Sequence, residues 1–149
     1  MSRLSLDANV LIYGVDAGDA SKHRTARRVI TFAAERDCVL TLQALAEFYF
    51  VATRKGKLGA MQVKMQINEL RSVFPMALPS SRTLGLAIDA SEQHRIGFWD
   101  GMLIAVTHEA GVGILLTEDL QDGQVYQGVR CLNPFTRTAV QLAKLIRSL

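Results

Sequence analysis

Short apolar segments alternate with longer amphipathic stretches along most of this 149-residue chain. The short segments have strand character and cover residues 3–8, 38–40, 76–78, 114–116 and 129–132. Most of the stretches between them are ten or more residues long, with apolar side chains at helical spacing. Parallel strands need connections of that length, whereas tight turns can join antiparallel strands. The alternation therefore predicts an α/β fold with a mostly parallel sheet and helices on both faces.

Capping residues and helix-stopping glycines predict where the helices begin and end. We expect one helix to be capped by Ser21, and another to begin after Thr41 and run to about Lys55, where Gly56 ends it. Further helices are expected at residues 60–74, 82–94 and 99–110. A chain of this length, about half hydrophobic, suits one domain with one core.

Four carboxylates lie where a purely structural sequence would carry hydrophobic residues: Asp7, Glu47, Asp100 and Asp119. An ionised carboxylate at the edge of a core is costly unless it is paired or binds a metal. Residues 3–8 alternate and continue into the apolar run 10–13, and we expect this segment to form a first strand that ends near Asp7. Asp119 also follows a strand. Glu47 and Asp100 fall early in predicted helices. Because ligands of open α/β sheets bind beyond the carboxyl ends of the strands, we expect the four acids to share one crevice.

Taken singly, these acids have simpler interpretations. Asp100 can stabilise a helix N-terminus, and Asp7 can form a turn at a strand end. Glu47 has apolar neighbours on both sides, which fits a solvated helix face poorly. As a set without Cys or His, the acids favour Mg²⁺ or Mn²⁺, which prefer oxygen ligands. Asn9 and Thr117 can support such a site, and turn and capping roles are equally compatible with them.

Basic residues outnumber the acids that remain when these four are set aside. The chain has 17 Lys and Arg against 14 Asp and Glu, so 17 − (14 − 4) leaves +7. The bases form two groups, Lys22, Arg24, Arg27 and Arg28, and Arg54, Lys55 and Lys57. Such an excess attracts a polyanion by a largely sequence-independent force. For either group alone, a solvated basic face is the alternative.

The sequence gives no sign of membrane insertion or secretion. No stretch approaches the ~18 consecutive apolar residues of a membrane span, and residues 1–3 lead into a strand. We therefore expect a cytoplasmic protein without membrane contact. Cys38 and Cys131 lie in short apolar segments and are expected to be buried thiols.

Four motifs resemble those of the PIN-domain nucleases. They are Leu-Asp-Ala-Asn-Val-Leu-Ile-Tyr at residues 6–13, Leu-Ala-Glu-Phe-Tyr at 45–49, Trp-Asp-Gly-Met-Leu-Ile-Ala at 99–105 and Leu-Thr-Glu-Asp-Leu at 116–120. Order, spacing and flanking residues all match from about residue 4 to residue 134. Within that family the chain is most similar to the VapC-type toxins of type II toxin–antitoxin pairs.

The resemblance implies a three-layer α/β/α sandwich and a Mg²⁺- or Mn²⁺-dependent ribonuclease. It also implies a homodimer that a small antitoxin inhibits, and an RNA substrate. Asp7, Glu47, Asp100 and Asp119 then become the metal-binding catalytic acids. Glu118 and Asp122 compete for the fourth position, and Asp119 is preferred because it stands two residues after Thr117. We expect residues 1–135 to form the nuclease domain and residues 136–149 a helical extension.

For this family, hydrolysis by water activated at the metal implies products with 5′-phosphate and 3′-hydroxyl ends. A housekeeping PIN nuclease without an antitoxin, or a non-catalytic domain that binds RNA or protein, is the alternative function. A phosphatase or phosphoacceptor domain would usually need a lysine beyond a later strand, and the chain has no lysine between Lys64 and Lys144. The three histidines lack paired partners in sequence, which disfavours an imidazole-based ribonuclease.

Overall fold

The computed structural model describes residues 1–54 and 58–149, and within them a six-stranded sheet has the order β3-β2-β1-β4-β6-β5. All neighbouring strands are parallel except β5, which pairs antiparallel with β6. The predicted mostly parallel sheet is therefore confirmed. The strands are β1 (Arg3–Leu6), β2 (Cys38–Thr41), β3 (Met76–Ala77), β4 (Val112–Leu116), β5 (Val125–Tyr126) and β6 (Val129–Leu132).

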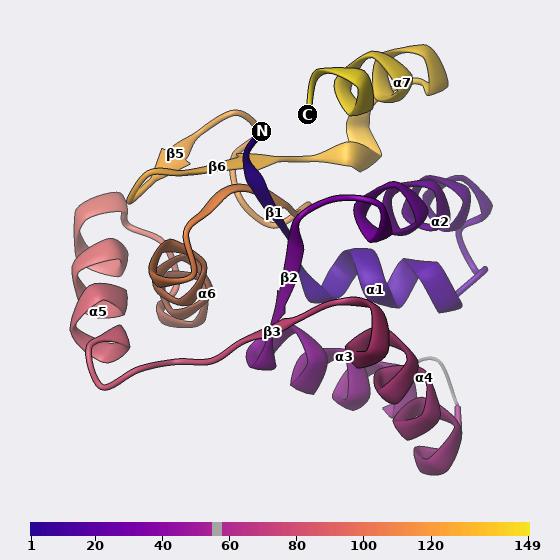
Figure 1. Ribbon diagram of the computed structural model, residues 1–149, viewed down its shortest axis with the longest axis horizontal. Coiled ribbons are helices and arrows are strands. Elements are labelled where there is room, and N and C mark those ends of the chain that lie inside the picture. The colour runs from indigo at the N-terminus through magenta and orange to yellow at the C-terminus, as the bar shows by residue number, and fades with distance from the viewer. Residues whose placement is uncertain (55–57) are drawn as a thin grey trace.

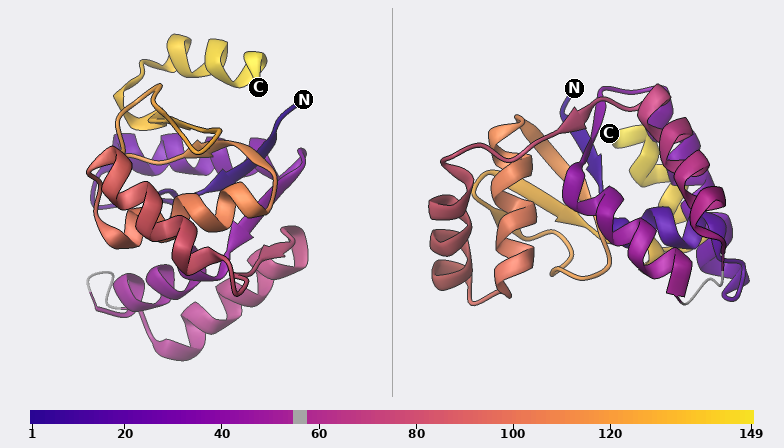
Figure 2. Two further views of the ribbon diagram at one scale, coloured as in Figure 1. Left: turned by 90° about the vertical axis from the view of Figure 1, so that its left-hand side faces the viewer. Right: turned by 90° about the horizontal axis from the view of Figure 1, so that it is seen from below.

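Helices cover both faces of the sheet, as Figure 1 and Figure 2 show, with α5 and α6 on one face and the other helices opposite. This arrangement confirms the three-layer α/β/α sandwich. The helices are α1 (Ala8–Val15), α2 (Ala20–Ala34), α3 (Leu42–Arg54), α4 (Ala60–Val73), α5 (Thr83–His94), α6 (Phe98–Glu109) and α7 (Ala139–Ser148), with a short 3₁₀ helix η1 (Pro134–Thr136) before α7.

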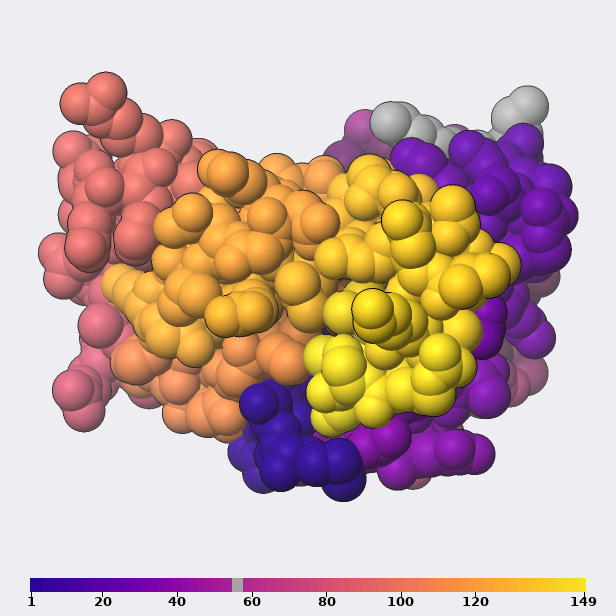
Figure 3. Space-filling model, turned by 90° about the horizontal axis from the view of Figure 1, so that it is seen from above, coloured from indigo at the N-terminus to yellow at the C-terminus, as the bar shows by residue number. Residues whose placement is uncertain are grey.

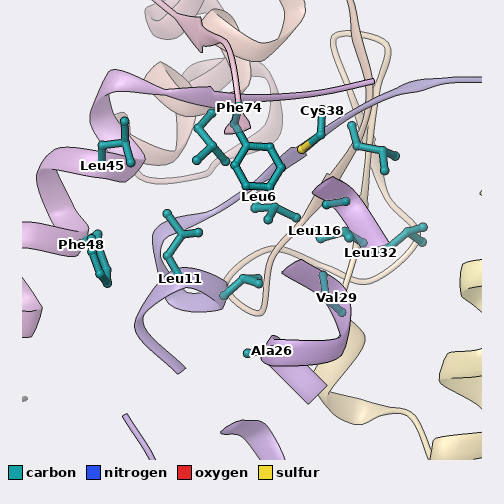
Figure 4. Packing of buried hydrophobic residues seen from close by; sticks show 14 of the residues in the cluster. Leu6, Leu11, Ala26, Val29, Cys38, Leu45, Phe48, Phe74, Leu116 and Leu132 are labelled. Atoms are coloured by element: carbon teal, nitrogen blue, oxygen red, sulfur yellow. The ribbon is translucent and has the colours of Figure 1, made fainter. Parts of the chain in front are cut away.

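Alternate residues of the central strands face two separate cores, because side chains of a strand point in turn to opposite faces. Leu40 and Leu116 belong to the larger core, which α1, α2, α3, α4 and α7 complete (Figure 4). Their strand neighbours Val39 and Leu115 belong to the second core, which α5 and α6 complete. Each central strand is thus buried on both sides, which explains its short, continuous apolar sequence.

The first strand ends next to Asp7, as expected, but two other local predictions near the N-terminus are wrong. The apolar run 10–13 is not part of the first strand but of α1, which begins directly after Asp7 because the Asp7 carboxylate accepts a hydrogen bond from the Ala8 amide. A four-residue apolar run fits a buried strand and a buried helix equally well, so the sequence alone could not distinguish the two elements. The next helix, α2, is capped by Asp19 and not by Ser21.

The other predicted elements are present with small shifts at their ends. Thr41 caps α3 as expected, since its hydroxyl accepts from the Ala44 amide. Lys55, Gly56 and Lys57, which the sequence analysis assigned to a helix end and a basic group, lie outside the described residues. The antiparallel strand β5 was not predicted, because two residues are too few to show a pattern.

The last helix, α7, packs on the body of the domain. A capping box of Thr138 and Gln141 starts it, and Leu142 is buried in the larger core. In Figure 3 it lies between the segment that carries β5 and β6 and helix α2. The division of the chain at residue 135 stays a prediction. Among the described residues, no helix is long and apolar enough to span a membrane.

Candidate active site

The carboxyl ends of the central strands β1 and β4 bring Asp7 and Thr117 together. Asp7 is only 5% exposed, and its backbone amide donates to the Leu116 carbonyl across the two strands. The Thr117 hydroxyl donates to Asp7 Oδ2 at 2.7 Å. One carboxylate oxygen of Asp7 therefore caps α1, and the other is held by Thr117, which follows the neighbouring strand. A turn at the end of β1 would explain only the first of these two contacts.

Asn9 connects this acid to Asp119. Its Nδ2 lies 3.3 Å from Asp7 Oδ2 and 3.1 Å from Asp119 Oδ2. The Asp119 amide in turn donates to the Thr117 hydroxyl at 3.1 Å, which explains the spacing of hydroxyl and acid in the sequence. Asn9 Oδ1 is buried without a hydrogen-bond partner among the described residues. A half-turn of this amide would bring Oδ1 beside the two carboxylates, and three oxygens so placed repel one another unless a cation or a proton lies between them.

The other two acids come from helices α3 and α6. Glu47 lies on the exposed side of α3, and its Oε1 accepts from Gln43 Nε2 at 3.3 Å. The same Gln43 nitrogen donates to the Trp99 carbonyl at 2.9 Å and so ties α3 to the start of α6. Asp100 is half-buried in the first turn of α6. The N-cap of this helix is Gly97, which has no side chain to accept from the first amides. Gln43 was missed in the sequence, where its only signal is its position one helical turn before Glu47.

Burial and the neighbouring acids Asp119 and Glu47 raise the proton affinity of Asp7 and Asp100. Burial raises the pKa of Asp7 to about 6, and the negative charges of Asp119 and Glu47 add to this against the hydrogen bonds from Thr117 and Ala8. Burial also raises the pKa of Asp100, again with contributions from Asp119 and Glu47. The four predicted acids thus share one electrostatic environment that lacks a compensating positive charge among the described groups, and a cation would relieve their repulsion.

The two competitors for the fourth position are occupied elsewhere. Glu118 accepts from Lys22 at 2.9 Å and from the Tyr13 hydroxyl at 2.8 Å. Asp122 Oδ1 pairs with Arg137 at 3.2 Å and accepts from the Asn133 amide. This geometry favours Asp119, which faces Asn9.

The donor set fits a hard divalent cation that keeps part of its water shell. In residues 1–54 and 58–149, no three Asp, Glu, His or Cys side chains lie close enough together to ligate one ion directly. All candidate donors are oxygens, and Mg²⁺ is usually held by one or two carboxylates and several waters. A site built from Asp7, Asp119 and the two helix acids, partly through water, matches that preference.

The histidines make contacts of other kinds. His23 Nδ1 lies 2.8 Å from the Tyr13 carbonyl, and His108 Nδ1 lies 2.7 Å from the Gln127 carbonyl. The His94 ring packs edge-on against Tyr126. Each imidazole is thus engaged in holding two segments together. The two cysteines are buried and free, as expected.

Several solved structures share this fold. VapC20 of Mycobacterium tuberculosis, described as a sarcin–ricin loop cleaving toxin, has a TM-score of 0.60 at 18% identity, covering 85% of this chain and 98% of that one. A DNA-bound VapBC from Salmonella typhimurium has a TM-score of 0.65 at 16% identity, covering 90% and 99%. A toxin–antitoxin complex from Klebsiella pneumoniae has a TM-score of 0.65 at 19% identity, covering 89% and 98%.

Comparisons of the amino-acid sequence with single proteins and with protein families give different results. No curated protein sequence gives a significant match. The PIN domain, in contrast, matches residues 4–125, which include all four acids and the strands that position them. The chain therefore belongs to the PIN-domain family.

Proposed function

We propose that this protein is the toxin of a type II toxin–antitoxin pair and acts as a Mg²⁺- or Mn²⁺-dependent endoribonuclease. The observation that carries the proposal is the convergence of Asp7, Asp119 and Asn9 at the carboxyl edge of the sheet, with Glu47 and Asp100 close enough to influence the same charges. The basic surplus elsewhere on the chain suits a polyanionic substrate.

The residues of the site would divide the work as follows. Asp7, Glu47, Asp100 and Asp119 would hold the cation, while Thr117 and Asn9 fix the orientation of Asp7 and Asp119. A divalent ion bound there supplies positive charge that orients a phosphodiester and lowers the pKa of water. Either Glu47, which lies on the exposed side of α3 beside Gln43, or the half-buried Asp100 is suited to orient the attacking water.

Purified protein tests the chemistry directly. We expect single-stranded RNA to be cleaved with Mg²⁺ or Mn²⁺ and to stay intact with EDTA, and Asp119→Asn to lose at least a hundredfold in rate. The products should carry 5′-phosphate and 3′-hydroxyl ends. A 2′,3′-cyclic phosphate would show that the 2′-hydroxyl and not water attacks, which this proposal does not allow.

The toxin assignment rests on the structural neighbours, which include two VapBC structures and a toxin–antitoxin complex. We propose that a small antitoxin encoded beside this gene binds and inhibits the protein, and that the protein forms a homodimer. Expression of the wild type alone should arrest growth, and co-expression of the neighbouring gene should restore it. Equal growth of cells that express wild type or Asp7→Asn would instead favour a non-catalytic binding domain. Cleavage without any neighbouring inhibitor gene would favour a housekeeping nuclease.

A further inference from the structure

A pocket of about 320 Å³ opens beside the acids at the carboxyl edge of the sheet. It lies between α1, the turn that follows α1 and the end of α3. Asn9 lines the pocket and also donates to Asp119, and Glu118, which lines it too, directly precedes Asp119 in the chain, so the pocket adjoins the candidate active site. Its volume is at the lower end of the range for small-ligand pockets, about 300–1,000 Å³. The described apolar lining consists of Ile12, Val15, Ala17, Val51, Ala52 and Leu58.

Asn9, Tyr13, Asp16 and Glu118 are the polar residues of the described lining. The Asn9 amide and the Tyr13 hydroxyl donate within the protein, so the two carboxylates are the main groups left to contact a ligand, and both are acceptors. Asp16 has one carboxylate oxygen that accepts from the Gly18 amide, which leaves the second oxygen for a ligand. Glu118 accepts from Tyr13 and Lys22, and each carboxylate oxygen can accept more than one hydrogen bond. No Lys, Arg or His is among the described residues that line the pocket. A ligand with donors along one edge and flat apolar faces would complement it.

We infer that this pocket binds a nucleobase next to the scissile phosphate and selects guanine. The inference rests on the proposed ribonuclease function. Guanine presents a ring N–H and an amino group side by side, which suits carboxylate acceptors, whereas uracil would place carbonyl oxygens against them. Recognition of single-stranded RNA commonly uses unstacked bases whose edges are read by hydrogen bonds. Lys22 pairs with Glu118 and compensates its charge. Of the two acids in the pocket, only Asp16 therefore repels the phosphates of RNA.

Short single-stranded RNAs test this preference without cleavage. We would titrate the wild type in EDTA with fluorescently labelled pentanucleotides that contain one guanosine, one inosine or only uridine, and measure anisotropy. Inosine lacks the amino group, so the inosine oligonucleotide should bind about tenfold more weakly than the guanosine one, the size expected for a hydrogen bond to a charged group. Uridine should bind most weakly.

Asp16→Asn is the matching protein variant. It keeps the oxygen that accepts from Gly18 and replaces the other with an amino donor. The preference for guanosine over inosine should therefore fall below about twofold, while the affinity for oligouridine should stay the same or rise, because an amino donor suits the carbonyl oxygens of uracil. Asp37→Asn is the control, because Asp37 is an exposed acid paired with Arg3 at the opposite edge of the sheet.

The possible results separate this inference from the function on which it rests. Equal binding of all three oligonucleotides by a protein that cleaves RNA would overturn the guanine pocket and leave the ribonuclease proposal intact. Guanosine selectivity that survives in Asp16→Asn would also overturn it. If Asp16→Asn weakens binding of the antitoxin and RNA binding shows no base preference, the pocket receives a protein side chain instead. A protein that neither binds nor cleaves RNA would refute the proposed function itself.

Discussion

Replacing Asp7 by asparagine should make the metal-free protein more stable at alkaline pH. A rise in the pKa of Asp7 from 3.8 to about 6 means that its ionised form costs the fold about 3 kcal/mol at pH 8. Asparagine removes that charge and can keep the oxygen that accepts from the Ala8 amide. It replaces the oxygen that accepts from Thr117, at a cost of about 1 kcal/mol. The net gain is about 2 kcal/mol, or ~4–8 °C in Tm for a domain of this size.

The direction in which the stability difference between wild type and Asp7→Asn changes with pH tests whether the ionised Asp7 carboxylate is its cause. Because the pKa of Asp7 is raised in the folded state, its favourable contribution is complete below pH 3.8 and is lost as the pH rises through about 6. At pH 4.5 only about 1 kcal/mol of the penalty remains, so wild type and Asp7→Asn should unfold at nearly equal temperatures. Urea or thermal unfolding in EDTA at both pH values measures this, with Asp37→Asn as the surface control. If Asp7→Asn is less stable than the wild type at pH 8, the ionised Asp7 carboxylate stabilises the fold and the prediction is refuted.

Three further changes test the geometry. Gly101→Ala should cost ~1–3 kcal/mol and lower activity, because a Cβ there would lie 2.6 Å from the Ala87 carbonyl of α5, whereas Gly85→Ala, with open space around it, should be neutral or slightly stabilising in thermal unfolding. Leu142→Ala should cost ~2–3 kcal/mol in urea unfolding, since its side chain is 3% exposed in the larger core; a smaller loss would mean that α7 is only loosely attached. Asp122→Asn should retain most cleavage activity, because Asp122 is paired with Arg137; if it matches Asp119→Asn in an RNA-cleavage assay, the fourth acid has been misassigned.

The sequence was sufficient where one pattern had one structural meaning. Short apolar segments separated by long amphipathic stretches predicted the parallel sheet, and Thr41 was recognised as a cap because its hydroxyl precedes a helical pattern. The run at residues 10–13 failed because buried strands and buried helices have the same composition over four residues.

The four acids stand out in the sequence because their neighbours along the chain are apolar, and their common role stays a prediction. The contacts that they make could not be predicted. The hydrogen bond between Asp7 and Thr117 joins residues 110 positions apart, and only the pairing of β1 with β4 creates it. Likewise, nothing in the sequence pairs Glu118 with Lys22, 96 residues away, although this ion pair is what distinguishes Glu118 from Asp119. Long-range pairings of this kind depend on topology and not on local pattern.

The placement of β4 between β1 and β6 also determines when this protein can become active during its synthesis. A ribosome that adds about 5–20 residues per second makes Thr117 roughly 6–22 s after Asp7. Until β4 arrives, β1 has only β2 beside it, and Asp7 has neither its threonine partner nor Asp119. Under the proposed activity, a growing chain that has not yet reached Asp119 therefore cannot cut the RNA of the ribosome that makes it.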